Sequence, residues 1–452
     1  MKKNINLLEG PILPSLSGLA LPIMATSLIQ MAYNLTDMIW IGRVGSSAVA
    51  AVGAAGMYMW LANGLATLAK MGGQVKVAQA LGAKENKQAV SYAKSALQLG
   101  IALGLVYGIV AVVLANPLID FFKLNSAKVV SDAKIYLQIT CGGVIFSFLN
   151  QIFTGIMTAM GNSRTSFVAT AAGLVINIIM DPILIFGIGP FAKMGVMGAG
   201  IATVFAQMIV TGVFVLAALK DEIIFQKVRL FEKVDRESMM TIVKIGFPTG
   251  IQSMIFTSIS MIIARMIAGF GDSAVAVQKV GSQIESISWM TAEGFGAAVN
   301  AFMAQNHGAK NQKRIVQGYK VAMRIEIVWG IFCTFVLMVF PAVIFKIFIP
   351  EADVLPMGVD YLKILGVSQL FMCIELTTAG AFSGLGKTIP PSISSIILTA
   401  ARIPMAIALT STALGLNGIW WSITISSIFK GVILVVWFLF YLKKMLAEKE
   451  HI

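Results

Sequence analysis

The stretch Gly45–Ala50 reads GSSAVA, and a second stretch, Gly271–Ala276, reads GDSAVA. Another pair follows in the same order: Ala78–Lys84 reads AQALGAK, and Ala304–Lys310 reads AQNHGAK. The members of both pairs are separated by the same spacing along the chain, which is half of its 452 residues. Self-similarity at a fixed long spacing indicates an internal repeat. The chain is therefore expected to consist of two equivalent halves.

The composition places both halves in a membrane. Of all residues, 57% are hydrophobic and only 12% are charged, and the mean hydropathy is +0.84. Soluble proteins carry about 25% charged residues. The apolar segments are about 20 residues long and apolar at consecutive positions, which is typical of membrane helices and not of alternating barrel strands. The sequence predicts an all-α integral membrane protein.

Twelve apolar segments of this kind occur along the chain. In the first half their approximate bounds are Leu13–Ile41, Ala48–Ala69, Ala96–Ala115, Ile135–Thr158, Phe167–Phe186 and Met197–Leu219. In the second half they are Ile245–Ala268, Val275–Ala301, Val321–Phe348, Tyr361–Phe382, Ile393–Thr412 and Ile419–Tyr441. Six segments in each half agree with the repeat. The sequence predicts twelve transmembrane helices in two six-helix lobes.

Lysine and arginine residues gather after the even-numbered segments, and this distribution predicts the orientation. They are Lys76, Lys84, Lys87 and Lys94 after the second, Lys220, Lys227, Arg229, Lys233, Arg236 and Lys244 after the sixth, Lys310, Lys313, Arg314 and Lys320 after the eighth, and Lys443, Lys444 and Lys449 after the twelfth. Basic loops face the cytoplasm. Both termini are therefore expected inside. The net charge of +13 is explained by topology, so nucleic-acid binding is not expected.

The longest charged stretch divides the chain. We expect an N-lobe at residues 1–219, a cytoplasmic linker at 220–244 that mixes charges of both signs, and a C-lobe at 245–452. Because each lobe has an even number of helices, both enter the membrane in the same direction. Repeats of this kind are related by a pseudo-two-fold axis along the membrane normal.

Charged residues inside a membrane segment are rare and usually functional. Asp37 is such a residue in the first segment, and Tyr33 lies one turn before it on the same helix face. Pro22, about four turns upstream, can bend this helix. A carboxyl group in an apolar setting is a candidate proton carrier. The alternative is that Asp37 lies near the outer interface and is simply hydrated.

The fifth segment contains a second polar group. Asn177 and Asp181 are four residues apart and share a helix face, and Pro182 frees a backbone carbonyl one turn earlier. Thr203 in the sixth segment can join this cluster. Such a set of oxygen atoms suits a proton or a cation. The alternative is an ordinary helix end before the Gly187–Gly195 loop.

The two halves differ at these positions. At the half-chain spacing of the repeat, Asp37 corresponds to Ile263. Around the fifth segment the spacing is one residue shorter, so Asp181 corresponds to Ala406 and Asn177 to Arg402. The acids of the first and fifth segments therefore belong to the N-lobe alone.

The C-lobe has acids of its own, Glu285 and Glu293 in the eighth segment and Glu375 in the tenth. They are candidates for binding a cationic substrate. The competing interpretation is that they pair with Arg265 or Arg402 inside the protein. The residues alone leave both interpretations open.

Other chemistries find little support. Cys141, Cys333 and Cys373 are odd in number and widely spaced, so neither a disulfide framework nor a metal cluster is expected. The motifs of zinc proteases, serine hydrolases and P-loop nucleotide-binding proteins do not occur, and the chain has only two histidines. We therefore expect neither an enzyme nor a bound cofactor.

Taken together, these motifs resemble the multidrug and toxic compound extrusion (MATE) family over essentially the whole chain. The resemblance rests on the paired AQxxGAK motifs, the helix with Pro22 and Asp37, the Asn177–Pro182 motif and the glycine-rich entry to the sixth helix at Gly195–Thr203. It implies a V-shaped protein of twelve helices that exports organic cations in exchange for protons or sodium. It also implies a multi-pass protein of a prokaryotic plasma membrane, acting as a monomer.

The N-lobe pattern is similar to the proton-linked, DinF-like branch of that family. This likeness implies that Pro22, Tyr33, Asp37, Asn177, Asp181 and Thr203 form the coupling network, with protonation of the helix-one acid bending the helix and releasing substrate. The NorM-like branch uses an acid in the seventh helix, where this chain has only Arg265. Sodium at Asp37, Asn177 and Asp181 stays open as an alternative.

Two functions are therefore weighed. The first is a secondary antiporter that exports cationic or amphipathic drugs in exchange for protons or sodium. The second is a flippase for lipid-linked precursors, which shares the broad architecture. Such a flippase is expected to line its cavity with several arginines, and this chain offers only Arg265 and Arg402 against five membrane acids. Besides drugs, membrane lipid is the expected partner.

Overall fold

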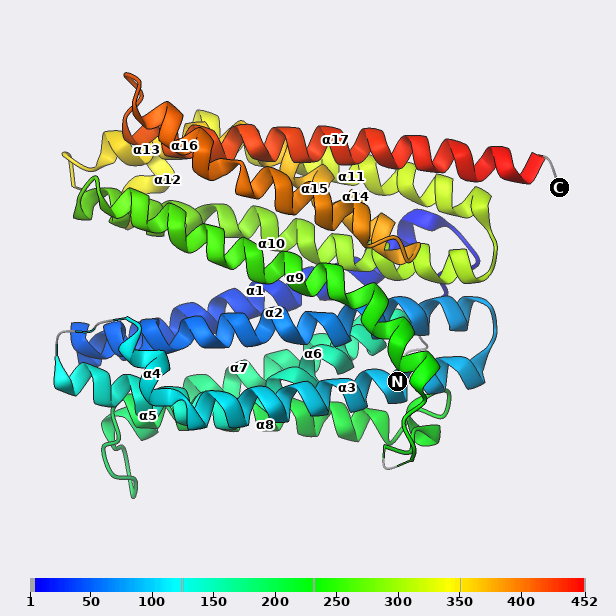
Figure 1. Cartoon of the computed structure of the whole chain (residues 1–452), viewed down its shortest axis with the longest axis horizontal. Helices are drawn as coiled ribbons and strands as arrows, with labels where there is room; N and C mark the ends of the chain where they lie inside the picture. The colour runs from blue at the N-terminus through cyan, green and yellow to red at the C-terminus, as the bar shows by residue number, and fades with distance from the viewer. Residues whose placement is uncertain (1–4, 123, 125, 231, 350, 451–452) are drawn as a thin grey trace. The chain divides into compact units, whose positions relative to one another are not determined.

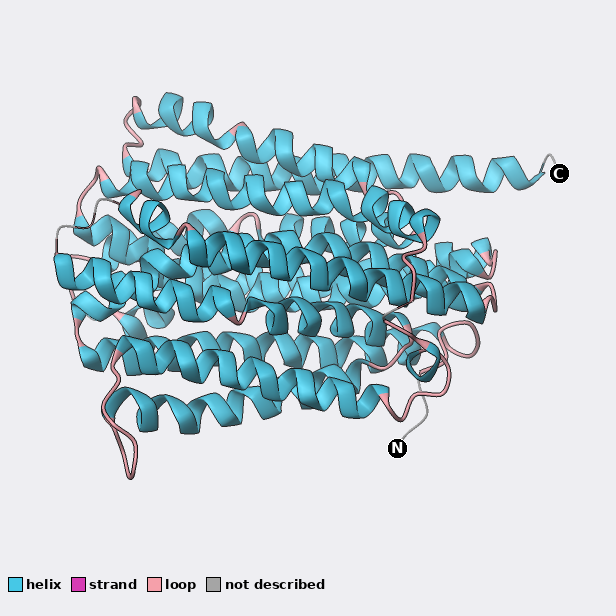
Figure 2. Ribbon diagram, turned by 60° about the horizontal axis from the view of Figure 1, so that its bottom comes forward, coloured by secondary structure: helices cyan, strands magenta, loops and turns pink. Residues whose placement is uncertain are grey.

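The computed structural model describes residues 5–122, 124, 126–230, 232–349 and 351–450, without the side chains of 35, 46, 272 and 448–450. Within these residues the chain is helical and contains no strand (Figure 2). The all-α prediction is confirmed.

The helix plan repeats along the chain. Helix α2 spans Ser46–Gly82 and α3 spans Asn86–Val113, whereas α10 spans Asp272–Gly308 and α11 spans Gln312–Val339 (Figure 1). Both bounds of each helix recur half a chain later. The helices that precede these pairs are α1 (Ile12–Val44) and α9 (Arg236–Ala268), and each contains a proline, Pro22 and Pro248. The repeat predicted from the sequence is thus a repeat of structure.

The remaining helices complete the two halves. The first half continues with α4 (Ala115–Asp120), α5 (Ala127–Gly142), α6 (Val144–Ala159), α7 (Ser163–Phe186), α8 (Val196–Ala218) and the 3-10 turn η1 (Phe225–Lys227). The second half continues with α12 (Pro341–Phe348), α13 (Leu355–Gly366), α14 (Gln369–Gly384), α15 (Ile389–Ala400), α16 (Arg402–Thr410) and α17 (Leu416–Glu450).

Among the described residues, 9 helical stretches are long and apolar enough to cross a membrane. Two bent pairs raise this number to 11, namely α5 with α6 at 45° and α13 with α14 at 44°. The predicted segment Val275–Ala301 lies within α10, whose polar residues, Glu285 and Glu293 among them, lower its hydropathy. Together these elements agree with the predicted twelve-helix fold.

Some helix bounds differ from the prediction for local reasons. The ninth segment was expected to begin at Val321, but α11 begins at Gln312 because the Asn311 side chain caps it by accepting from the Arg314 backbone N–H at 3.1 Å. The fourth segment was expected as one helix and is bent at Gly143. Hydropathy does not mark such caps and bends.

The chain forms two compact units. Unit 1 comprises residues 1–5 and 25–251, and unit 2 comprises residues 6–24 and 252–452. The boundaries thus fall inside α1 and α9. The predicted division at residues 219 and 245 rests on the repeat and the charge pattern, and it stays a prediction.

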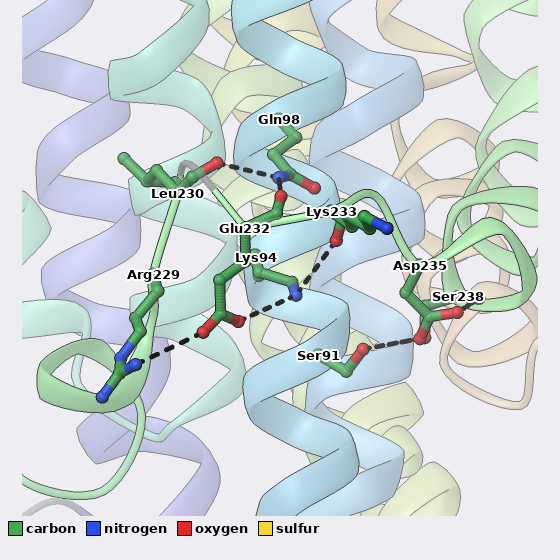
Figure 3. A network of polar contacts seen from close by, with 9 residues as sticks. All are labelled: Ser91, Lys94, Gln98, Arg229, Leu230, Glu232, Lys233, Asp235 and Ser238. Carbon is green, nitrogen blue, oxygen red and sulfur yellow. Dashed lines mark hydrogen bonds and ion pairs between the residues drawn. The ribbon is translucent and has the colours of Figure 1, made fainter.

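Within unit 1, the segment after α8 folds back onto α3 (Figure 3). The Phe225 ring packs against Phe153 at 5.5 Å between centroids. Gln98 of α3 donates to the backbone oxygens of Leu230 and Glu232 at 2.8 and 3.0 Å. The segment is therefore anchored to the helices of its own unit.

Candidate functional site

The polar cluster of unit 1 is formed by helices that are far apart in the sequence. Asp37 and Tyr33 come from α1, Asn177 and Asp181 from α7, and Thr203 from α8. Asp37 and Asp181 interact electrostatically with each other and with Tyr33. The structure therefore brings together the acids of the first and fifth predicted segments.

Hydrogen bonding in this cluster is incomplete. The Asn177 side chain donates from Nδ2 to Oδ1 of Asp181 at 3.1 Å, and both residues are fully buried. Asp37 Oδ1, Asp181 Oδ2 and the Tyr33 hydroxyl are buried and make no hydrogen bond of ordinary geometry among the described residues, although the Asp37 and Asp181 carboxyl groups lie within reach of each other and Tyr33 lies within reach of Thr203. Buried oxygens are normally paired. These atoms are therefore available to hold a proton or a cation.

Thr203 and Pro22 differ in how they relate to this cluster. The Thr203 hydroxyl donates to the Ala199 carbonyl of its own helix at 2.9 Å, and it also lies within hydrogen-bonding reach of the Tyr33 and Tyr136 hydroxyls. Pro22 lies inside α1, well before Asp37, and in the segment that belongs to unit 2. Its position leaves the predicted bending role of Pro22 a hypothesis.

Tyr136 of α5 is a member of this cluster that the sequence reasoning missed. It is buried and interacts electrostatically with Asp37, Tyr33 and Asp181. The sequence does not single out Tyr136, because one tyrosine in a long apolar segment usually packs against neighbouring helices and has no other role. At a spacing one residue short of half the chain it corresponds to Tyr361, so the repeat was the available clue.

The corresponding place in unit 2 is apolar. Ile263 and Ala406, the counterparts of Asp37 and Asp181, are 5% and 0% exposed and lie in one hydrophobic cluster with Ile259 and Ile267. Ile263 and Ala406 have no side-chain oxygen to offer to a proton or cation. The cluster of acids is therefore a property of unit 1.

Unit 2 places its own acids in a hydrogen-bonded network. The Tyr361 hydroxyl of α13 donates to Glu285 of α10, and Gln369 of α14 donates to the other carboxylate oxygen at 3.4 Å. The Gln278 side chain donates to the Tyr361 hydroxyl and accepts from the Trp420 indole N–H at 3.0 Å. Glu285 is thus held by neighbouring side chains.

Glu375 forms a buried ion pair. Its Oε1 atom lies 3.2 Å from Nζ of Lys430 on α17, and the two side chains are 9% and 8% exposed. From the sequence, Arg265 or Arg402 was the expected partner of the C-lobe acids, and Lys430 was not expected. Arg265 is exposed. Arg402 is buried, interacts electrostatically with Glu375 and Glu285, and donates to Ser426 and Ser427.

Two further acids of unit 2 differ in exposure. Glu293, a predicted substrate ligand, is exposed on α10. Glu326 of α11 is 1% exposed, its Oε2 has no hydrogen-bond partner among the described residues, and it lies near Cys333 and Cys373. The sequence reasoning missed Glu326 because it falls close to the predicted start of that helix.

Within the described residues, no three His, Cys, Asp or Glu side chains come together in a way that could hold a metal ion. Cys141, Cys333 and Cys373 are free and buried. A sodium ion at Asp37, Asn177 and Asp181 would use amide and carboxylate oxygens, so it stays a prediction.

Known proteins resemble the chain over nearly its full length. The probable multidrug resistance protein NorM of Thermotoga maritima is 28% identical over 427 residues, 93% of this chain and 91% of that protein. The probable multidrug resistance protein YoeA of Bacillus subtilis is 27% identical over 90% of this chain and 89% of its own length.

A solved structure agrees with this resemblance. It is described as the outward-facing conformation of a multidrug resistance MATE family transporter of the MOP superfamily. Its TM-score is 0.91 at 22% identity, over 98% of this chain and 99% of that one, which shows the fold. The MatE family model matches residues 22–183 and 248–408, well over half of the chain. The chain therefore belongs to the MatE family of membrane transporters.

Proposed function

We propose that the chain is a secondary antiporter that exports cationic or amphipathic organic compounds in exchange for protons, with Asp37 and Asp181 as the proton-binding groups. The observation that carries this proposal is the buried pair of acids in unit 1, which has oxygens that make no hydrogen bond of ordinary geometry and no basic side chain paired with it in the described part of the chain. The names of the relatives support drug export.

Proton exchange at this pair follows from electrostatics. Two carboxylates that lie close together in an apolar setting repel each other, so binding a proton removes both the repulsion and a buried charge. Asn177 orients Asp181 through its 3.1 Å hydrogen bond, and Tyr33 and Tyr136 line the pair. Because α1 carries Asp37, a change in the charge of the pair acts directly on that helix. Export then requires that the proton and the substrate favour different states of the protein.

The substrate would be recognised by acids of unit 2. Of the three candidate acids, Glu375 is paired with Lys430 and Glu285 accepts hydrogen bonds from Tyr361 and Gln369, whereas Glu293 is exposed on α10. Its exposure makes Glu293 the first candidate for attracting an organic cation.

A lipid-linked precursor flippase is the second candidate. It is favoured by two buried cations of unit 2, Arg402 and Lys430, because a pyrophosphate headgroup needs such partners. Each of them already has polar partners in the protein, however, and Glu375 neutralises Lys430. The antiporter therefore explains more of the arrangement.

The test is efflux of a fluorescent organic cation such as ethidium from proteoliposomes, driven first by a pH gradient alone and then by a sodium gradient alone. We expect the pH gradient to drive efflux, and Asp37→Asn and Asp181→Asn to reduce it at least about tenfold. Asp120→Asn is the matched control because Asp120 is exposed and pairs with Lys134 on the surface.

Efflux by Asp37→Asn at the normal rate would contradict the assignment of the proton-binding group. If the sodium gradient alone drives efflux, the coupling ion at these residues is sodium and not the proton. Binding of a lipid pyrophosphate and not of the dye would favour the flippase.

A further inference from the structure

Unit 2 contains a shallow groove between α11 and α17, two helices that lie side by side in Figure 1. The groove has a volume of about 260 Å³, and its lining residues are Tyr319, Lys320, Met323, Arg324, Val435 and Leu439. Lys320 and Arg324 are four residues apart and therefore lie on the same face of α11. The groove thus combines an apolar floor with two cations.

The same helix face in unit 1 has a known occupant. At the half-chain spacing of the repeat, Lys320 corresponds to Lys94 of α3 and Arg324 to Gln98. Lys94 Nζ lies 3.5 Å from the Glu232 carboxylate and 3.5 Å from the Lys233 carbonyl (Figure 3). Gln98 holds the backbone of the same segment. In unit 1 this face therefore binds an acidic group together with main-chain oxygens.

Among the described residues of unit 2, none occupies this face in the same way. Where unit 1 continues from α8 into the segment that returns to α3, α17 continues as a helix to Glu450. Lys320 and Arg324 are exposed, and neither has an ion-pair or hydrogen-bond partner among the described residues. Two neighbouring cations without a counter-ion attract an anion from the surroundings.

Lipid is the expected surrounding of this groove, because both α11 and α17 are long and apolar enough to cross a membrane. One turn beyond Arg324, the side chain of Val328 is 69% exposed, and Leu439 and Phe440 on α17 are 52% and 69% exposed. Lys320 and Arg324 lie in the third and fourth turns of α11. Long basic side chains at such depths extend toward the headgroup level.

We propose that the groove between α11 and α17 binds an acidic phospholipid, with Lys320 and Arg324 holding the phosphate and Met323, Val435 and Leu439 contacting an acyl chain. Basic pockets between membrane helices are known to select such headgroups. In the predicted orientation this site faces the cytoplasmic leaflet. The lipid would take the place that the Glu232 segment takes in unit 1.

The proposal is tested on the purified full chain in neutral detergent. Native mass spectrometry and thermal unfolding are measured with added phosphatidylglycerol, with phosphatidylcholine of the same acyl chains, and with inorganic phosphate. We expect phosphatidylglycerol to bind and to raise the unfolding midpoint more than phosphatidylcholine does. Each cation near an anionic lipid is worth about fivefold in affinity, so Lys320→Gln/Arg324→Gln should bind at least tenfold more weakly.

The matched control is Lys313→Gln/Lys387→Gln, which removes two exposed cations outside the groove and should keep normal binding. Because all four residues are exposed, both variants are expected to fold, and Arg324→Lys should retain most of the binding. The proposal is overturned if the groove variant binds phosphatidylglycerol as tightly as the control. It is also overturned if phosphatidylcholine or inorganic phosphate has the same effect. None of these readouts depends on proton coupling.

Discussion

In unit 1, Asp37 and Asp181 lie together without a basic partner in the described part of the chain, whereas in unit 2 Glu375 lies 3.2 Å from Lys430. The two units share a helix plan, with α2 and α3 repeated as α10 and α11. The difference teaches that a common scaffold can hold a buried acid beside a cation, as at Glu375, or without one, as at Asp37 and Asp181 and also at Glu326 of unit 2. An acid without a cation can change its charge, and an acid paired with one can hold two helices together.

The buried pair of unit 2 should give the largest effect on stability. Lys430→Met leaves Glu375 buried without its cation, and removing one partner of a buried ion pair costs about 3–5 kcal/mol. The measurement is unfolding in detergent for both single variants and for the double variant with Glu375→Gln. The loss of unfolding free energy in the double variant should be smaller than the sum of the losses in the two single variants. If it equals that sum, the ion pair does not hold α14 to α17.

Asn177→Ala probes unit 1 and should have a smaller effect. It removes the donor to Asp181 Oδ1, and a typical intramolecular hydrogen bond contributes about 0.5–1.5 kcal/mol. Thr154→Val is the control, since the Thr154 hydroxyl lies outside this cluster and donates to the Asn150 carbonyl of its own helix at 2.8 Å. Equal losses of unfolding free energy in the two variants would argue against a special role for Asn177.

The smallest effect is expected outside the membrane, at Asp235, which precedes α9. Its carboxylate accepts hydrogen bonds from the hydroxyls of Ser238 at 2.6 Å and Ser91 at 2.8 Å, and these bonds lower the pKa of Asp235 below its usual value. Asp235→Ala should cost about 1 kcal/mol at neutral pH, as loss of an N-cap does.

The pH dependence of this effect has a definite sign. Because the pKa of Asp235 is lower in the folded state, its contribution is complete above the unfolded pKa of about 3.9 and is lost as the pH falls through the folded pKa. The unfolding midpoints of the wild type and Asp235→Ala should therefore converge in strong acid. A constant difference from pH 7 down to pH 2 would show that the charge of Asp235 does not matter.

The sequence predicted the parts of this structure that repeat or that are long. The half-chain spacing of the repeat predicted that the helix plan of α2 and α3 recurs in α10 and α11, and hydropathy predicted the membrane segments. Asp37 and Asp181 could be linked because each is a rare charge beside other polar residues. Their counterparts Ile263 and Ala406 proved to be neighbours in one apolar cluster.

What the sequence did not reveal are contacts between distant helices. Lys430 lies in an apolar segment far along the chain from its partner Glu375, and no local pattern joins them. Glu326 is fully buried but falls near a predicted helix end, because the cap at Asn311 starts α11 earlier than hydropathy indicates. Such pairings depend on how helices pack, which the order of residues alone does not specify.

The central claim is that the acids that gain and lose a proton lie in unit 1. Infrared difference spectroscopy between neutral and acidic pH detects the protonated carboxyl directly. The account predicts a protonated-carboxyl band that Asp37→Asn and Asp181→Asn reduce or abolish and that Lys430→Met/Glu375→Gln leaves in place. A band that persists in Asp37→Asn/Asp181→Asn, or disappears with the unit 2 pair, would contradict it.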